Sequence, residues 1–489
     1  MICINYLTLK LHMPFYSYFD FRESLFSIAT LPDAELRAGL LDALWVALCK
    51  TEQVPFKLGS RVAFLYKGEA KCVQWYGDFN AWGHARSIHS HGERIGLSDV
   101  WILERDLPRN ARIDYKLVVD GVWMLDPMNP YTCKSGYGKS SELRMPDYEF
   151  PSETLPRSDT HKGSLHQFTI QSKYLGYDVD YVVYLPYQYR RESQLPVIYA
   201  TDGYEYLDDE QGALRVTLDN LIHDEKIAPV MCVFIDPRNP HNKSENRRLK
   251  EYAMNEAFGK FVTEELVPTI DATYKTNPSP KARVILGTSM GGLCAGYFGV
   301  AFSSHFNLLA IQSPSFWNKP ELFAMYRKAK HLPLTIYLST GIIYDSLQKT
   351  REMKDLFIKN DYALFYRETN ESHSWGTWRG RLPEMLYYFF GLKKHQILYE
   401  LPDMAHQPKP PHLKNKTAIK FNFTPHDEVE HATMKIYDMY GQEILTVFNE
   451  RKPRGFYSFD CNELGLTHGL YFYSLKSKSI SKYKMFSVR

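Results

Sequence analysis

The chain has 489 residues, of which 44% are hydrophobic and 24% are charged, with a net charge of +3. This length exceeds what one hydrophobic core organises, so we expect two to four domains. Because 59 basic residues nearly balance 56 acidic ones, the overall charge favours neither nucleic acid nor an anionic membrane as a partner. No apolar run in the sequence approaches the length of a membrane span.

The cysteines and the N-terminus give no sign of a metal site, a disulfide framework or a signal peptide. The seven cysteines are scattered, odd in number and form no C-x-x-C pair. The residues after Met1 lack a charged segment followed by an unbroken apolar one, and a start at Met13 makes an equally poor signal.

The first 150 residues divide into a helical part and a β-rich part. Residues 1–50 are predicted to form an extension and one amphipathic helix, because leucines recur at helical spacing after Asp33, which is placed to cap it. Residues 51–150 switch to short alternating runs such as 61–66. This alternation predicts a small β-sandwich.

Residues 160–395 alternate strands with helices after an opening β-hairpin. The short apolar runs, each followed by turn or helix signals, are 196–200, 230–235, 283–286, 308–312, 335–339 and 363–366. Buried parallel strands have this pattern, which predicts an α/β domain with helices on both faces of a mainly parallel sheet.

The rest of the chain is predicted to be a linker and another β domain. Residues 396–416 are rich in proline and have no periodicity, which is typical of an extended linker. Residues 417–489 alternate again and predict a small antiparallel sandwich.

Ser289 is the strongest candidate for a catalytic residue. The segment 284–292 is an apolar strand that breaks into G-x-S-x-G just before a helix-forming stretch, as in a nucleophile elbow. There Gly287 and Gly291 avoid Cβ clashes around a strained serine, and the helix N-terminus helps to hold negative charge. A serine between glycines is also an ordinary turn, so the motif alone leaves both interpretations open.

An acyl-transfer serine needs a base, an acid that orients the base, and N–H donors for the oxyanion. In this fold class the order along the chain is serine, acid, histidine, and Asp345 and His373 follow successive predicted strands in that order. The alternative role for Asp345 is to cap the helix predicted around 347–359, and capping and catalysis can coexist.

The oxyanion hole is predicted to use the backbone N–H of Met290, the residue after the serine, and one N–H from the loop after the first parallel strand. In that loop Tyr204 or Gly203 is the expected donor. The sequence does not separate this role from that of a plain tight turn.

Aromatic and basic residues near these loops are candidates for substrate binding. Trp317, Trp375 and Trp378 flank the catalytic loops and either form a wall for an aryl or sugar group or pack the edge of the core. The loop 238–248 carries three arginines, of which Arg247 is our candidate for an anionic substrate; the alternative is a solvated charged loop.

Four phrases together resemble the esterase D superfamily, in particular enterochelin esterases and the related feruloyl and acetyl-xylan esterases. They are Asp202-Gly203, the segment 287–292 around the serine, 312–317 and 371–379. The resemblance implies Ser289 as nucleophile, His373 as general base and Asp345 as the acid, with Glu371 and Asp361 as alternative acids. It implies an ester substrate and no metal or organic cofactor.

The flanking regions carry resemblances of their own. The phrases 77–82 and 120–130 resemble the early-set, immunoglobulin-like modules that precede the catalytic domains of glycogen-branching enzymes and of enterochelin esterases. The phrases 436–444, 464–473 and 484–489 resemble the C-terminal sorting domains of type nine secretion system cargo. The expected fold class is therefore an α/β-hydrolase domain flanked by two immunoglobulin-like β-sandwiches.

The resulting hypothesis is a serine carboxylic-ester hydrolase of the siderophore-esterase or carbohydrate-esterase type. The alternative is a non-catalytic glycan-binding protein on a hydrolase scaffold, which the phrase 77–82 suggests. The sorting-like segment implies a secreted or cell-surface protein that contacts the secretion machinery, whereas the missing signal peptide implies a cytoplasmic one.

Overall fold

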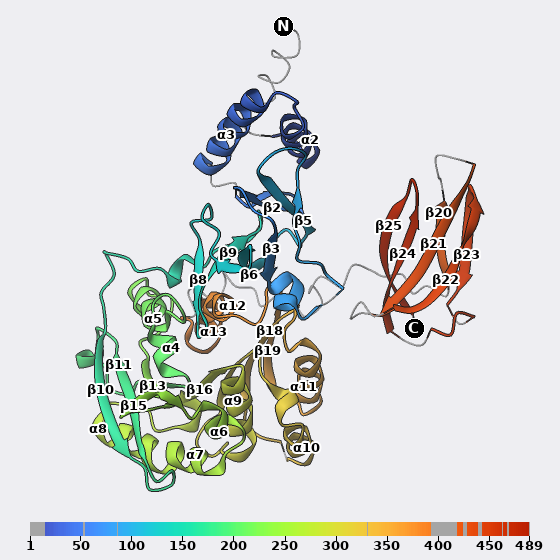
Figure 1. Ribbon diagram of the computed structural model, residues 1–489. Coiled ribbons are helices and arrows are strands. Elements are labelled where there is room, and N and C mark those ends of the chain that lie inside the picture. Colours follow the sequence, from blue (N-terminus) through green and yellow to red (C-terminus); the bar gives the residue numbers. More distant parts are fainter. Residues whose placement is uncertain are drawn as a thin grey trace. The chain divides into compact units, whose positions relative to one another are not determined.

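The computed structural model forms two compact units, Met1–Ile397 and Leu398–Arg489 (Figure 1). The residues that it describes are 15–51, 54–85, 87–329, 331–392, 418–423, 428–438, 443–461, 463–466 and 469–488. The predicted linker at 396–416 lies outside them.

The described part of the N-terminal segment, from residue 15 on, forms two helices, where the leucine spacing predicts only one. They are α2 (Tyr18–Ala29) and α3 (Ala34–Lys50), capped by the side chains of Ser17 and Asp33. The two helices pack together through buried apolar residues, which include Phe21, Leu25, Ile28, Leu41, Leu44 and Leu48. The buried residues of α2, which are Phe21, Ser24, Leu25, Ile28 and Ala29, recur at helical spacing, so this helix has an apolar face that packs against α3.

Residues 54–150, which we call the N-terminal β-region, form two sheets. The first has the order β1-β2-β5-β4, and the second has the order β3-β6-β9-β8 with β7 paired to β6. The strands are β1 (Phe56–Leu58), β2 (Arg61–Lys67), β3 (Val73–Gly77), β4 (Glu93–Arg94), β5 (Val100–Asp106), β6 (Arg112–Val119), β7 (Val122–Met124), β8 (Thr132–Ser135) and β9 (Gly138–Arg144). Phe64 of β2 and Trp75 of β3 belong to one buried cluster, so the two sheets share a core.

Residues 164–392, the central α/β domain, contain an eight-stranded sheet of order β10-β11-β13-β12-β16-β17-β18-β19. The strands are β10 (Ser164–Gln171), β11 (Asp178–Leu185), β12 (Val197–Ala200), β13 (Met231–Asp236), β16 (Arg283–Thr288), β17 (Leu308–Gln312), β18 (Thr335–Gly341) and β19 (Ala363–Thr369). The pairs β10/β11 and β11/β13 are antiparallel, and the pairs from β13 to β19 are parallel. The sheet is mainly parallel, as the sequence predicts.

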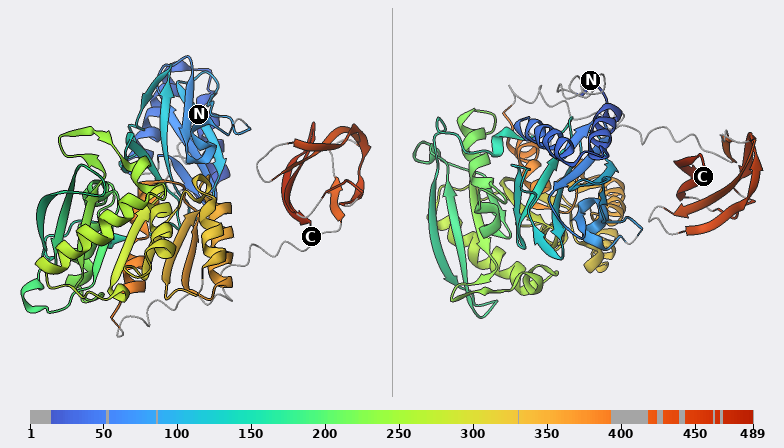
Figure 2. Two further views of the ribbon diagram at one scale, coloured as in Figure 1. Left: turned by 90° about the horizontal axis from the view of Figure 1, so that it is seen from below. Right: turned by 45° about the horizontal axis from the view of Figure 1, so that its top comes forward.

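Helices cover both faces of this sheet (Figure 2). Residues of α5 and α13 belong to the buried cluster on one face, and residues of α8, α9, α10 and α11 belong to the cluster on the other. The helices are α4 (Gly203–Leu207), α5 (Leu214–His223), α6 (Arg248–Tyr252), α7 (Glu256–Lys260), α8 (Val267–Thr273), α9 (Met290–Ala301), α10 (Glu321–Lys328), α11 (Leu347–Lys359), α12 (Trp375–Gly380) and α13 (Leu382–Phe390). A sheet buried on both faces needs the continuous apolar strands seen in the sequence.

The described residues of the C-terminal unit form two sheets, β20-β23 and β22-β21-β24-β25. Its strands are β20 (Ala418–Phe423), β21 (Val429–Asp438), β22 (Glu443–Pro453), β23 (Gly455–Asp460), β24 (Gly469–Ser477) and β25 (Ser481–Val488). Ile419 of β20 and Met434 of β21 lie in one buried cluster.

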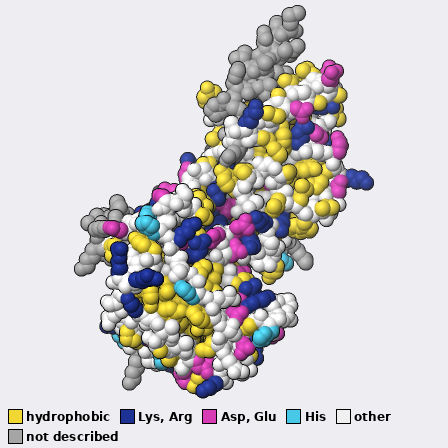
Figure 3. Space-filling model, turned by 90° about the vertical axis from the view of Figure 1, so that its left-hand side faces the viewer, with side chains coloured by type: hydrophobic (Ala, Val, Ile, Leu, Met, Phe, Trp, Pro, Cys, Tyr) yellow, Lys and Arg dark blue, Asp and Glu magenta, His cyan; other side chains and the backbone are white. Residues whose placement is uncertain are grey.

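Among the helices of the described residues, none has the length and apolar character needed to cross a membrane. On the face drawn in Figure 3, basic and acidic side chains are interspersed with hydrophobic ones, which matches the near-balanced composition.

Candidate active site

Ser289 lies on a sharp turn between β16 and α9. Its φ of 57° and ψ of −116° are strained for a residue with a side chain. A Cβ on Gly287 would lie 2.1 Å from the carbonyl oxygen of Gly291, so the turn closes only with glycine at 287. The geometry is that of a nucleophile elbow, which presents the serine side chain at the carboxyl edge of the sheet.

The structure brings Ser289, His373 and Asp345 together in one hydrogen-bonded line. His373 Nε2 lies 2.9 Å from Ser289 Oγ, and His373 Nδ1 lies 2.7 Å from Asp345 Oδ1. Asp345 follows β18 and His373 follows β19, so both loops open at the carboxyl edge beside the elbow. The arrangement has the base within reach of the serine and the acid behind the base.

Asp345 is held by four donors. Its Oδ1 also accepts from the Ser346 N–H at 2.6 Å, and its Oδ2 accepts from Ser313 Oγ at 2.6 Å and from the Gly341 N–H at 2.7 Å. Burial alone would raise the pKa of Asp345, but the bonds from His373, Ser313 and Gly341 outweigh it and hold the pKa below its ordinary value. The carboxylate therefore stays charged next to the histidine.

A residue other than Asp345 lies at the N-cap of α11, and the two alternative acids occupy other positions. Ser346 occupies the N-cap position of α11, one residue after Asp345. Glu371 is buried and lies 3.6 Å from Arg381, and Asp361 sits ahead of β19, at the opposite end of that strand from His373.

The predicted oxyanion donors begin two helices. Met290 is the first residue of α9, and Gly203 and Tyr204 begin α4 after Asp202, whose φ of 52° turns the chain sharply. Neither the Met290 N–H nor the Tyr204 N–H meets an acceptor among the described residues. Free N–H groups next to the serine are what an oxyanion hole requires.

Ser289 and His373 open into a cavity of about 690 Å³. The central α/β domain contributes Tyr204, Glu205, Asn246, Arg248, Ser289, His373, Ser374, Trp375 and Trp378. The N-terminal β-region contributes Asp78, Trp82, Asp114, Lys116, Ser135, Gly136, Tyr137 and Ser140. The cavity thus has walls from both regions, and no motif in the sequence predicts this.

The predicted substrate-binding residues fall into two groups. Trp375 and Trp378 line the cavity, and the Trp378 ring meets the His373 ring edge-on at a centroid distance of 5.0 Å. Trp317 is 61% exposed and is absent from the described cavity wall. Arg247 stacks on Tyr177, and its neighbour Arg248 reaches the cavity instead.

Glu205 is a cavity residue that sequence reasoning missed, because only the fold brings it next to Trp375 and Gln211. It is 8% exposed and accepts a hydrogen bond from Gln211 Nε2 at 3.3 Å. Burial, reinforced by the nearby Asp202 carboxylate, raises the pKa of Glu205 to about 7.

This raised pKa predicts that Glu205 makes the folded state less stable as the pH rises. Glu205 keeps its proton to a higher pH in the folded state than in the unfolded chain. The stability that protonated Glu205 contributes is therefore complete below about pH 4.5 and is lost as the pH approaches 7. We expect Glu205→Gln to unfold at a higher temperature than wild type at pH 8, because its free energy of unfolding rises by on the order of 2 kcal/mol. At pH 5 we expect the two proteins to differ little. Thermal unfolding at both pH values measures this. The exposed Glu321→Gln serves as control, and an equal shift at pH 5 and pH 8 would contradict the prediction.

A family model and a solved structure are similar to this part of the chain. Residues 172–389 match the model of the family described as "Putative esterase". Together with the structural likeness below, this supports an esterase-type α/β-hydrolase-like fold for the central α/β domain.

Two relatives and one solved structure illustrate the similarity. The endo-1,4-beta-xylanase/feruloyl esterase of Xylanibacter ruminicola is 29% identical over 188 residues, which are 37% of this chain and 25% of that protein. The iron(III) enterobactin esterase of Escherichia coli K12 is 25% identical over 189 residues, which are 35% of this chain and 44% of that protein. The chain therefore spans less than half the length of these two relatives.

The solved structure is the enterobactin esterase of Shigella flexneri in the presence of enterobactin. It aligns with a TM-score of 0.58 at 21% identity and covers 69% of this chain and 94% of that chain. At this identity the likeness establishes the shared fold.

Proposed function

We propose that this protein is a serine carboxylic-ester hydrolase that works through an acyl-enzyme. The observation that carries the proposal is the hydrogen-bonded line from Asp345 through His373 to Ser289, with Ser289 on the elbow. The esterase family match over residues 172–389 supports the same reaction class.

In the proposed mechanism, His373 Nε2 takes the proton of Ser289 Oγ as that oxygen attacks the ester carbonyl carbon. The N–H groups of Met290 and of Tyr204 or Gly203 hold the charge that develops on the carbonyl oxygen. His373 then gives the proton to the leaving alcohol. Water deprotonated by His373 next attacks the acyl-enzyme, which releases the acid and restores Ser289.

The substrate that we propose carries an aryl or sugar group, as in enterochelin-like, feruloyl or acetyl-xylan esters. The aromatic side chains of Trp82, Tyr137 and Trp375 offer flat surfaces around the reacting serine. Arg248 and Lys116 place positive charge in the same cavity, which suits anionic or catecholate groups.

A panel of feruloyl, acetyl-xylan and catecholate-siderophore esters tests the proposal, with Ser289→Ala as the blank. We expect turnover of at least one ester by the wild type and none by the variant. Tight polysaccharide binding without turnover of any ester would instead favour the non-catalytic glycan-binding alternative.

We also propose that residues 417–489 direct export, which rests on their resemblance to type nine sorting domains. The compact unit Leu398–Arg489 is separate from the unit that holds the triad. Deletion of residues 417–489 is therefore expected to abolish export in the native host and to leave ester hydrolysis by the purified protein unchanged. Immunoblots of medium and cell-surface fractions measure export, and unaltered export of the deleted form would refute this role.

A further inference from the structure

The segment 370–374, which carries His373, lies between the two regions of its unit and contacts each with alternate residues. Glu371 pairs with Arg381, and His373 bonds Asp345 and Ser289, all within the central α/β domain. Residues 370, 372 and 374 instead bond the N-terminal β-region. The Ser374 N–H donates to the Ser372 carbonyl oxygen at 3.0 Å, so the chain turns tightly at His373, and the residues on either side of the histidine are available to a different partner.

Asp78 receives the middle contact. Ser372 Oγ donates a hydrogen bond to Asp78 Oδ2, and both residues are buried. Asp78 is itself fixed, because Oδ2 also accepts from the Asp114 N–H at 2.6 Å and Oδ1 accepts from Trp82 Nε1 at 2.9 Å. The Asp78 carboxylate is therefore held in place, and it bonds Ser372, the residue directly before His373.

Arg112 makes the other two contacts. Its Nη1 donates to Ser374 Oγ at 2.7 Å, and its backbone N–H donates to the carbonyl oxygen of Asn370 at 3.2 Å. A Cβ on Gly376 would lie 2.0 Å from the guanidinium, so the start of α12 closes directly over Arg112. The guanidinium thus bonds one residue after His373, and the backbone N–H bonds three residues before it.

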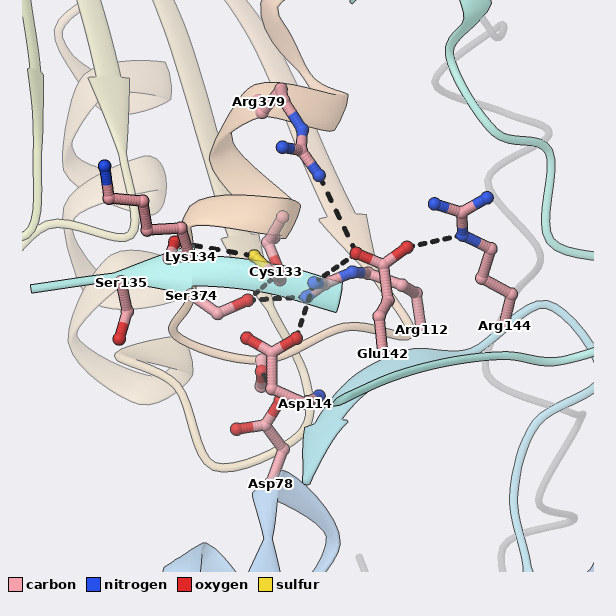
Figure 4. A network of polar contacts seen from close by, with 12 residues as sticks. Asp78, Arg112, Asp114, Cys133, Lys134, Ser135, Glu142, Arg144, Ser374 and Arg379 are labelled. Atoms are coloured by element: carbon pink, nitrogen blue, oxygen red, sulfur yellow. Dashed lines mark hydrogen bonds and ion pairs between the residues drawn. The ribbon is translucent and has the colours of Figure 1, made fainter. Parts of the chain in front are cut away.

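The guanidinium is fixed by two buried carboxylates (Figure 4). Arg112 Nη2 donates to Asp114 Oδ1 at 2.5 Å and to Glu142 Oε2 at 2.7 Å, and Arg112 is 1% exposed. Glu142 also pairs with Arg144 and, at 3.7 Å, with Arg379 of α12. Burial raises the pKa of Glu142, but Arg112 and Arg144 outweigh it and bring the pKa to about 2.

Three side chains of this cluster could in principle bind a metal ion. Asp114, Cys133 and Glu142 bring donor atoms within 4.8 Å of one another. Arg112 already bonds both carboxylates, so a side chain supplies the cation that they need.

We propose that the N-terminal β-region positions the general base, with Asp78 and Arg112 as positioning residues that clamp Ser372 and Ser374 on either side of His373. This inference rests on the proposed serine-esterase function. A histidine on a loop has rotational freedom, and a misplacement of about 1 Å is enough to cost about 100-fold in rate. The clamp removes that freedom from the backbone, while Asp345 orients the ring.

Ser372→Ala is the sharpest test, because Ser372 does not line the described cavity wall and Asp78 keeps its other two donors. We expect kcat for a short p-nitrophenyl ester to fall about 10–100-fold with KM within about threefold. The rate of Ser289 phosphonylation by a fluorophosphonate, which needs the base but not the substrate pocket, is expected to fall equally. Ser372→Thr retains the hydroxyl and is expected to restore both rates.

The matched control is Ser24→Ala, which removes a buried hydroxyl that has no hydrogen-bond partner among the described residues. We expect wild-type kcat in this variant. Ser374→Ala breaks the second clamp independently, and active-site titration normalises kcat to the folded fraction in every variant. Wild-type kcat and phosphonylation rates in both Ser372→Ala and Ser374→Ala would overturn the inference. So would losses that disappear on normalisation or that Ser24→Ala reproduces.

The failure of this inference differs from the failure of the proposed function. Activity retained by Ser289→Ala would refute the serine mechanism itself. An inactive Ser289→Ala together with fully active Ser372→Ala and Ser374→Ala variants would leave the mechanism intact and refute only the clamp.

Discussion

Ser289→Ala is expected to lower kcat by on the order of 10⁶-fold for every ester that the wild-type protein hydrolyses. The variant loses the hydroxyl oxygen that lies 2.9 Å from His373 Nε2, so no acyl-enzyme can form at this position. The cavity keeps its other walls, so an ester or product analogue is expected to bind with little change. Single-turnover and steady-state assays on the same ester measure the loss.

Two further variants make this result decisive. Ser304→Ala removes an exposed hydroxyl that bonds the neighbouring His305, and it is expected to keep wild-type kcat. Ser315 Oγ lies 3.3 Å from Ser289 Oγ, so any residual turnover in Ser289→Ala is checked with the double variant that also carries Ser315→Ala. Near-wild-type kcat in Ser289→Ala would exclude Ser289 as the nucleophile.

Local signals in the sequence were sufficient to locate the parts of the site on strands and loops. Each parallel strand is a short apolar run, and residues after such runs gather at one edge of the sheet, so Ser289, Asp345 and His373 could be placed together before any contact was known. The elbow needs small residues at fixed spacing, which is also visible in the sequence.

The contribution of the N-terminal β-region could not be read in this way. Asp78 and Ser372 are 294 positions apart, and their contact depends on how two separately formed cores pack. Trp82 lines the cavity while its Nε1 bonds Asp78. The hydrophobic periodicity of a sequence does not predict such contacts between regions.

The choice among neighbouring side chains was equally beyond the sequence. Arg247 and Arg248 are adjacent at the start of α6, and their side chains point in different directions. Arg247 stacks on Tyr177, whereas Arg248 pairs with the buried Asp202 at 2.8 Å and reaches the cavity. The buried carboxylate selects which arginine enters the site, and only the fold places that carboxylate.

Asp345→Asn is expected to lower kcat by about 10⁴-fold while the protein stays folded. Both carboxylate oxygens accept two hydrogen bonds, including those from the N–H groups of Gly341 and Ser346, which cannot turn away. An amide NH₂ must face one of these N–H groups. When the NH₂ group lies on the His373 side, it donates to Nδ1, so the ring proton must sit on Nε2. A protonated Nε2 cannot accept the proton of Ser289.

Kinetics with matched amide variants decide which acid orients His373. Asp361→Asn is the control, because Asp361 has a φ of 56° that asparagine tolerates, and we expect wild-type kcat. Glu371→Gln disturbs the pair with Arg381 and is expected to affect stability more than kcat per folded site. A 10⁴-fold loss in Glu371→Gln together with an active Asp345→Asn would assign the acid to Glu371.

Because the pKa of Asp345 is lowered in the folded state, its ionised form stabilises the fold above about pH 4, and this stabilisation is lost as the pH falls further. Asp345→Asn is therefore also expected to flatten the acid limb of the thermal unfolding profile, which separates loss of this charge from a general loss of structure.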